Sequence, residues 1–178
     1  MLCPALAAPQ APTVPASAAP PDDGQWTMPA KNYAATRYSA LNEINGANVS
    51  QLQVAFAFST GVDRGQEAAP IVANNTMFIV TPYPNIVFAL DLTKPGAPIK
   101  WSYQPHPAAA SQGVACCDVV NRGATYSDGK LFFNTLDDTT IALDAETGRE
   151  LWKTKLGDIN TGETITMAPL VVKGKVLV

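Results

Sequence analysis

The sequence has 178 residues, of which 47% are hydrophobic and 15% are charged, with a formal net charge of −3. This length predicts one domain, and the acidic balance gives no basic surface for nucleic acid. No run approaches the ~18 apolar residues that a transmembrane helix needs, so a membrane-spanning protein is excluded. The single histidine excludes a His-rich zinc site, and three cysteines are too few for a small disulfide-stapled fold.

Residues 1–24 are expected to lie outside the fold. Alanine and proline dominate Met1–Pro21, and no Lys or Arg precedes Lys31. Residues 2–8 resemble the end of the apolar part of a signal peptide, followed by small residues that suit cleavage. This segment is interpreted as the remnant of an export signal, with a disordered linker as the alternative.

From residue 54 onward, short β-branched and aromatic runs alternate with turn residues, which predicts strands. Four are expected at Pro70–Ala73, Thr76–Thr81, Ile86–Asp91 and Ile99–Gln104. Four more are expected at Gly123–Ser127, Lys130–Thr135, Thr139–Asp144 and Glu150–Leu156, and a third set begins with Thr166–Val172. The predicted fold is all-β: about two and a half blades of a β-propeller within 66–178, namely 66–104, 122–156 and a truncated blade from 166. Two hairpins in a β-sandwich are the alternative.

A repeated motif supports the propeller. Ala142-Leu143-Asp144 is followed by Thr147-Gly148 and ends at Trp152, and an earlier copy runs from Ala89 through Asp91 to Trp101. The two aspartates are 53 residues apart, close to the ~40–50-residue period of propeller blades. We expect the Asp to cap its turn, Gly148 to take a positive φ, and the Trp to fill the gap between neighbouring sheets.

Cys116 and Cys117 are adjacent and lie between the two complete repeats. Reduced, they would be small buried hydrophobic residues. Bonded to each other they would form a strained ring, because neighbouring Cα atoms are ~3.8 Å apart and disulfides usually span ~4.4–6.8 Å. A zinc site is disfavoured, since no second Cys pair and no histidine lies near.

The Ala-x-Asp-x-x-Thr-Gly-x-x-x-Trp motif resembles the repeat of quinoprotein dehydrogenase propellers. The segment from Gly113 to Gly123 resembles the vicinal-disulfide loop of the methanol/ethanol family of pyrroloquinoline quinone (PQQ) dehydrogenases. The resemblance covers residues 25–178, including 26–33, 36–39, 41–49, 58–62, 64–70 and 164–169. Gln66 and Ala68 depart from the family, whose members often have His and Gly there.

The resemblance implies an eight-bladed propeller of which this chain is the N-terminal part. It implies a periplasmic enzyme that oxidises a small primary alcohol to an aldehyde with PQQ and a calcium or lanthanide ion, and that passes electrons to a cytochrome c. It leaves a homodimer of the full-length enzyme open. This chain alone is expected to be inactive, because the catalytic base and the metal ligands of the family come later in the sequence.

The resemblance also assigns the candidate site. Cys116 and Cys117 would form a disulfide that is the platform for one face of PQQ. Arg122 would pair with a cofactor carboxylate, Thr166 would donate its hydroxyl to another, and Glu67 would line the same edge. No catalytic residue and no metal ligand is assigned within this chain, since Asp118, Asp137 and Asp138 are interpreted as turn carboxylates.

Residues 25–65 are expected to form an N-terminal segment whose Gln53–Thr60 stretch pairs with the last blade and closes the ring. The rival hypothesis is a cofactor-free propeller module that binds a partner or acts as a scaffold. It predicts no need for the cysteine pair or for Arg122 at this spacing.

Overall fold

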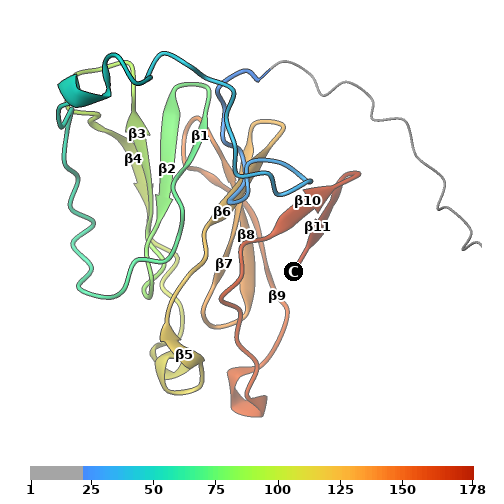
Figure 1. Ribbon diagram of the computed structural model, residues 1–178. Helices are drawn as coiled ribbons and strands as arrows, with labels where there is room; N and C mark the ends of the chain where they lie inside the picture. The colour runs from blue at the N-terminus through green and yellow to red at the C-terminus, as the bar shows by residue number, and fades with distance from the viewer. Residues whose placement is uncertain (1–21) are drawn as a thin grey trace, which may run out of the picture.

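The computed structural model describes residues 22–178, apart from the side chains of Cys116 and Cys117. The predicted export-signal remnant therefore lies outside the described residues, except for its last three. Within the described part there are only strands, turns and three short 3-10 helices: η1 (Val49–Gln51), η2 (Ala109–Gly113) and η3 (Ile159–Thr161). Figure 1 shows two large sheets followed by a smaller hairpin.

Each large sheet has four antiparallel strands that lie side by side in chain order. The first sheet contains β1 (Ile71–Ala73), β2 (Thr76–Val80), β3 (Val87–Asp91) and β4 (Ile99–Tyr103). The second contains β6 (Ala124–Ser127), β7 (Lys130–Thr135), β8 (Thr139–Asp144) and β9 (Glu150–Lys155). The hairpin consists of β10 (Leu170–Val172) and β11 (Lys175–Leu177), and β5 (Cys116–Val119) lies between the large sheets in the sequence.

The same two-residue turn opens all three sheets. Its central residues have positive φ in each case: Asn74 and Asn75, Asp128 and Gly129, and Lys173 and Gly174. Positive φ at both positions is typical of the type I′ turn, whose twist matches that of the strands that it joins. The strands around the turns pair in the same register, as Ala73↔Thr76, Ser127↔Lys130 and Val172↔Lys175. The predicted internal repeat is therefore confirmed.

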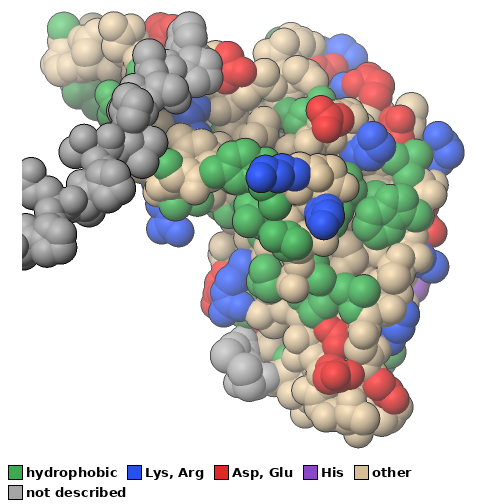
Figure 2. Space-filling view, turned by 90° about the vertical axis from the view of Figure 1, so that its right-hand side faces the viewer, with side chains coloured by type: hydrophobic (Ala, Val, Ile, Leu, Met, Phe, Trp, Pro, Cys, Tyr) green, Lys and Arg blue, Asp and Glu red, His purple; other side chains and the backbone are tan. Residues whose placement is uncertain are grey.

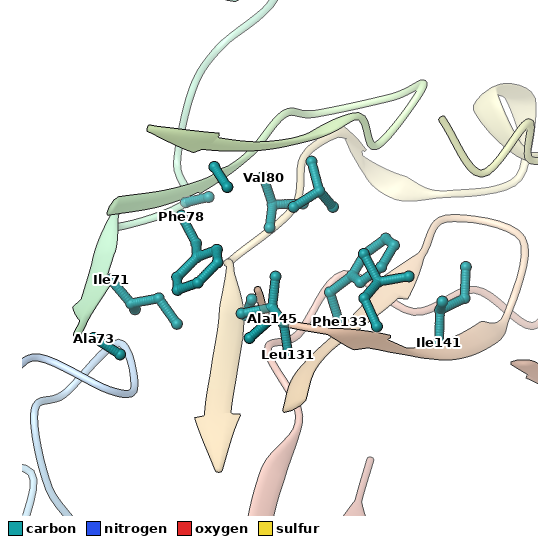
Figure 3. Close-up of a cluster of buried hydrophobic side chains, with 13 residues drawn as sticks. Ile71, Ala73, Phe78, Val80, Leu131, Phe133, Ile141 and Ala145 are labelled. Atoms are coloured by element: carbon teal, nitrogen blue, oxygen red, sulfur yellow. The ribbon is translucent and has the colours of Figure 1, made fainter. Parts of the chain in front are cut away.

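The three sheets are arranged around a common axis. Strand β6 lies against β1 on one side and against β10 on the other, so the first strand of each sheet is the innermost. Between the two large sheets, Phe78 and Val80 face Leu131, Phe133 and Ile141 (Figure 3). Each such side chain stabilises the fold by about 1.5–3 kcal/mol relative to an exposed position. This is the partial β-propeller that the sequence predicts, and the sandwich alternative is wrong.

Trp101 joins the two large sheets as expected. Its indole N–H donates to the carbonyl of Ala145 at 3.1 Å, in the β8–β9 turn of the next sheet. Gly148 has a φ of +73°, and a Cβ there would lie 2.6 Å from the Trp101 ring. The glycine therefore supplies both the turn conformation and the space for the indole. In the same turn the carboxylate of Asp144 accepts from the amide of Thr147 at 2.9 Å, which is the predicted cap.

The N-terminal segment contacts the innermost strand of every sheet. Trp26 forms a two-way bridge with Val72 of β1. The carbonyl of Thr27 accepts from Tyr126 of β6 at 2.8 Å, and the hydroxyl of Tyr33 donates to the carbonyl of Val171 in β10 at 2.5 Å. These three contacts tie residues 26–33 to all three blades.

Three local features differ from the expectation. Residues 53–60 form no strand, and Val54 is 86% exposed, although Phe58 packs edge-on against Phe88 at 5.1 Å. Their pairing with a last blade stays a prediction, because no such blade lies among residues 22–178. The third set of strands begins at Leu170 rather than at Thr166, since Pro169 has no N–H for a ladder. Strand β5 was not predicted.

Candidate functional site

Three of the five predicted site residues occupy equivalent places in successive blades. Glu67 precedes β1, Arg122 precedes β6, and Thr166 precedes β10. Each residue thus lies just before the start of the innermost strand of its blade, and the three residues lie at the same end of the axis. The repeat thus brings together side chains that are far apart in the sequence.

Arg122 is the centre of this group. Its Nε lies 3.5 Å from Oε2 of Glu67, and its Nη1 donates to the hydroxyl of Thr166 at 2.5 Å. The backbone amide of Arg122 also donates to the carbonyl of Thr166 at 2.9 Å. About half of the Arg122 and Glu67 side chains is exposed, 46% and 49%, so the guanidinium remains open to a further acceptor. This set can hold an anion through a cation and a hydroxyl.

Gly123 allows the chain to pass close to the first sheet. Its φ is +111°, and a Cβ there would lie 3.4 Å from the carbonyl oxygen of Ala69 and 3.6 Å from Pro29. The turn after Arg122 is therefore packed between the N-terminal segment and the residues that precede β1. This packing positions the backbone of Arg122 next to the segment that carries Glu67.

Cys116 and Cys117 begin β5, in the loop that leads to Arg122. Their side chains lie outside the described residues, so the disulfide and its platform role stay predictions. The backbone of β5 is attached to the first sheet, because the amide of Tyr83 donates to the carbonyl of Val119 at 2.8 Å. Asp118 lies within the strand with a φ of +61°, rather than in the turn that was expected.

Asp137 and Asp138 share a turn but differ in their electrostatics. Burial raises the pKa of Asp137, but hydrogen bonds from Thr135 and Ala108 and the charge of Lys155 outweigh it, so the net shift is downward. Burial also raises the pKa of Asp138, and here Glu163 raises it further. Both aspartates lie in the turn, as expected, but the pKa of Asp137 is lowered whereas that of the buried Asp138 is raised.

Two buried amides beside the candidate site were not predicted from the sequence. Asn121 and Asn134 are 1% and 0% exposed. Asn121 hydrogen-bonds the amide of Gly123 and the carbonyl of Asn134, and Asn134 donates to the carbonyl of Met167. Asn134 could have been noticed in the sequence, since asparagine is uncommon in a strand as apolar as Leu131-Phe132-Phe133.

Among residues 22–178, leaving aside the two cysteine side chains, no group of three or more His, Cys, Asp or Glu could hold a metal ion. The same part of the chain contains no helix with the length and hydrophobicity to cross a membrane.

Comparison with known proteins agrees with this geometry. Residues 26–153 match the family described as "Glucose/ethanol/alcohol dehydrogenase, beta-propeller domain", abbreviated PQQ. Over 157 residues the chain is 58% identical to a protein of Methylacidiphilum fumariolicum (strain SolV) named lanthanide-dependent methanol dehydrogenase, with coverage of 88% of this chain and 26% of the relative. It is 48% identical over 162 residues to methanol dehydrogenase (cytochrome c) subunit 1 of Methylobacterium organophilum, with coverage of 88% and 26%.

Solved structures give the same result. A europium-containing methanol dehydrogenase superposes with a TM-score of 0.82 at 58% identity, covering 85% of this chain and 26% of that one. A quinohemoprotein alcohol dehydrogenase of Pseudomonas putida HK5 superposes with a TM-score of 0.81 at 38% identity, with coverage of 87% and 22%. The chain thus spans about a quarter of the length of these relatives. It belongs to the PQQ-dependent glucose/ethanol/alcohol dehydrogenase family, the β-propeller oxidoreductases that include the methanol dehydrogenases.

Proposed function

We propose that this chain is the N-terminal part of a complete quinoprotein dehydrogenase that oxidises a small primary alcohol to the aldehyde. In this proposal the enzyme is exported to the periplasm, uses PQQ with a lanthanide or calcium ion, and passes electrons to a cytochrome c. Methanol is the first substrate to test, because the relatives that are 58% and 48% identical are named methanol dehydrogenases.

The observation that carries the proposal is the meeting of Arg122, Glu67 and Thr166 at one end of the axis. PQQ is a flat quinone with three carboxylates, so its site needs cationic and hydroxyl donors. Arg122 can bind a carboxylate through charge-assisted hydrogen bonds, and Thr166 can donate its hydroxyl to another. The residues therefore fit the cofactor.

Each residue has a separate role in this proposal. Arg122 supplies the positive charge, and Glu67 orients the guanidinium through the 3.5 Å ion pair. Thr166 places a neutral donor beside that cation. Cys116 and Cys117 would cover one face of the ring system. When bound, PQQ and its metal ion supply the electron-accepting quinone and a Lewis acid, while the residues of this chain hold the cofactor by its rim.

Purification of the complete protein from the periplasm of a PQQ-producing host tests this function. We expect about one PQQ per protein and methanol-dependent reduction of an artificial electron-acceptor dye, in the presence of lanthanum or calcium. The same preparation without PQQ is the matched control and should be inactive. A folded complete protein that binds no PQQ would refute the proposal and support the alternative of a cofactor-free scaffold module. The names of the relatives, which are dehydrogenases, speak against that alternative.

A further inference from the structure

Asn134 is the penultimate residue of β7, follows the apolar run Leu131-Phe132-Phe133, and is fully buried. Its Oδ1 accepts from the hydroxyl of Thr140 at 2.8 Å, and its Nδ2 donates to the carbonyl of Met167 at 2.9 Å. The first contact lies within the second sheet and orients the amide. The second contact reaches the segment that leads to the third sheet, directly after Thr166.

A second buried amide extends this connection toward Arg122. Nδ2 of Asn121 donates to the backbone carbonyl of Asn134 at 2.9 Å, and Oδ1 of Asn121 accepts from the amide of Gly123 at 2.8 Å. Asn121 and Gly123 flank Arg122 in the sequence. The two asparagines therefore connect the backbone on both sides of Arg122 to the residue that follows Thr166.

These side-chain bonds add nothing to the sheet ladder. Asn134 and Thr140 already face each other in the backbone register of β7 and β8. A buried amide is unfavourable unless its hydrogen bonds are satisfied, and an apolar residue would pack in such a strand without that requirement. What the amide adds is an attachment at the carbonyl of Met167, next to the bond from the Arg122 amide to the Thr166 carbonyl. Two attachments at consecutive carbonyls restrict rotation of the segment.

We infer that Asn134 is a positioning residue, which sets the Thr166 hydroxyl relative to the Arg122 guanidinium and thereby fixes the spacing of two donors for the carboxylates of PQQ. This inference rests on the proposed function. It assigns Asn134 no contact with the cofactor, so its effect must pass through Thr166.

The test is a double-mutant cycle in the complete protein, expressed in a host that makes no PQQ and titrated with PQQ. Asn134→Asp keeps the shape of the side chain and the acceptor for Thr140 but removes the donor to Met167. We expect its dissociation constant for PQQ to rise about five- to tenfold, the size of one lost hydrogen bond. In a Thr166→Val background the same change should alter the constant less than about twofold. Thr140→Val removes the hydroxyl that orients the side-chain amide of Asn134, and it should raise the dissociation constant for PQQ by a smaller factor. This variant replaces Asn134→Asp in the test if Asn134→Asp does not fold.

Leu143→Ala is the control for a general loss of stability. Leu143 is equally buried in the second sheet and belongs to the hydrophobic cluster between the two large sheets. We expect it to lower the unfolding midpoint by at least as much as Asn134→Asp, without changing PQQ affinity. Additive effects of Asn134→Asp and Thr166→Val, or equal effects of Asn134→Asp and Leu143→Ala, would overturn the inference. If Arg122→Ala and Thr166→Val leave PQQ affinity unchanged, the proposed function is refuted instead.

Discussion

Arg122 contacts two partners from two different blades, and the shape of its side chain makes this double contact feasible. Its Nε faces Glu67 while its Nη1 donates to Thr166. A planar guanidinium presents several donors at fixed angles, whereas a lysine ammonium is a compact charge on a flexible stem. The position therefore requires arginine rather than any cation.

We predict that Arg122→Ala weakens PQQ binding in the complete protein by about ten- to a hundredfold, the range for a charged hydrogen bond. Arg122→Lys should weaken it less, because the charge stays but the fork is lost. Asp118→Asn should have little effect, because the negative charge of Asp118 is of the wrong sign to bind a carboxylate of the cofactor. PQQ content per folded protein measures all three. Full occupancy in Arg122→Ala together with loss in Asp118→Asn would contradict the assignment.

We predict that Cys116 and Cys117 form a disulfide with each other in the exported protein. The periplasm is an oxidising compartment in which disulfides persist. Intact-mass analysis after alkylation, with and without prior reduction, detects it. Alkylation before reduction should modify neither residue, and alkylation after reduction should add two further groups, one on each of them. Two free thiols at these positions in fresh protein would contradict the prediction.

At the scale of elements, the strands of the two large sheets were predictable because hydrophobic alternation and turn residues agree there. In β2, for example, Thr76, Phe78 and Val80 are buried in alternation. The contact of Arg122 with Thr166 was not readable from any local pattern, because it depends on which strands are innermost. The connection of Asn134 to the site was missed for the same reason, since its partner Met167 lies 33 residues away.

Gly148 gives an element-scale prediction with an internal control. Gly96 lies in the equivalent turn of the first sheet, with a φ of +77° and no atom within 4 Å of the position that a Cβ would take. Gly96→Ala should therefore show only the cost of a left-handed alanine, about 1–2 kcal/mol. Gly148→Ala should cost about 1–3 kcal/mol more, because its Cβ would overlap the Trp101 ring. Denaturant unfolding followed by tryptophan fluorescence compares the two, and equal losses would disprove the packing role.

The β7–β8 turn gives a pH prediction of opposite sign for its two aspartates. Burial and Glu163 raise the pKa of Asp138. Its ionisation therefore lowers the free energy of unfolding as the pH rises above the ordinary pKa of an aspartate. Asp138→Asn should therefore increase the free energy of unfolding at pH 7, with the gain disappearing toward pH 3. The pKa of Asp137 is lowered, so its ionised form stabilises the fold at pH values above the ordinary pKa of an aspartate, and this stabilisation is lost on acidification. Asp137→Asn should therefore lower the free energy of unfolding at pH 7. Urea unfolding at several pH values checks both signs, and a destabilising Asp138→Asn at neutral pH would contradict the argument.

At the scale of the whole molecule, one lateral face of the structure carries a group of exposed hydrophobic side chains. Figure 2 shows hydrophobic side chains gathered on the side of β9, β10 and β11. The exposed large hydrophobic residues of this region are Trp152, Leu156, Leu170, Leu177 and Val178. Trp152 occupies the position in its repeat that Trp101 occupies in the first, where the indole packs on the next blade. Exposed large hydrophobic side chains that gather in this way are typical of a surface that packs against further structure.

We predict that the 178-residue chain alone does not oxidise alcohols, even with PQQ and calcium or lanthanum added. The described residues contribute Glu67, Arg122 and Thr166 from three blades on one side of the axis, and the chain covers 26% of the length of the methanol dehydrogenases that it matches. A cofactor held from one side remains open to water, so the donors of this chain would act in a medium that weakens their electrostatic interactions. Dye-linked oxidation of methanol and ethanol is the measurement, with the complete protein as positive control and its Arg122→Ala variant as the control for cofactor-independent dye reduction. Turnover by the purified chain above that background would show that three blades suffice for the reaction.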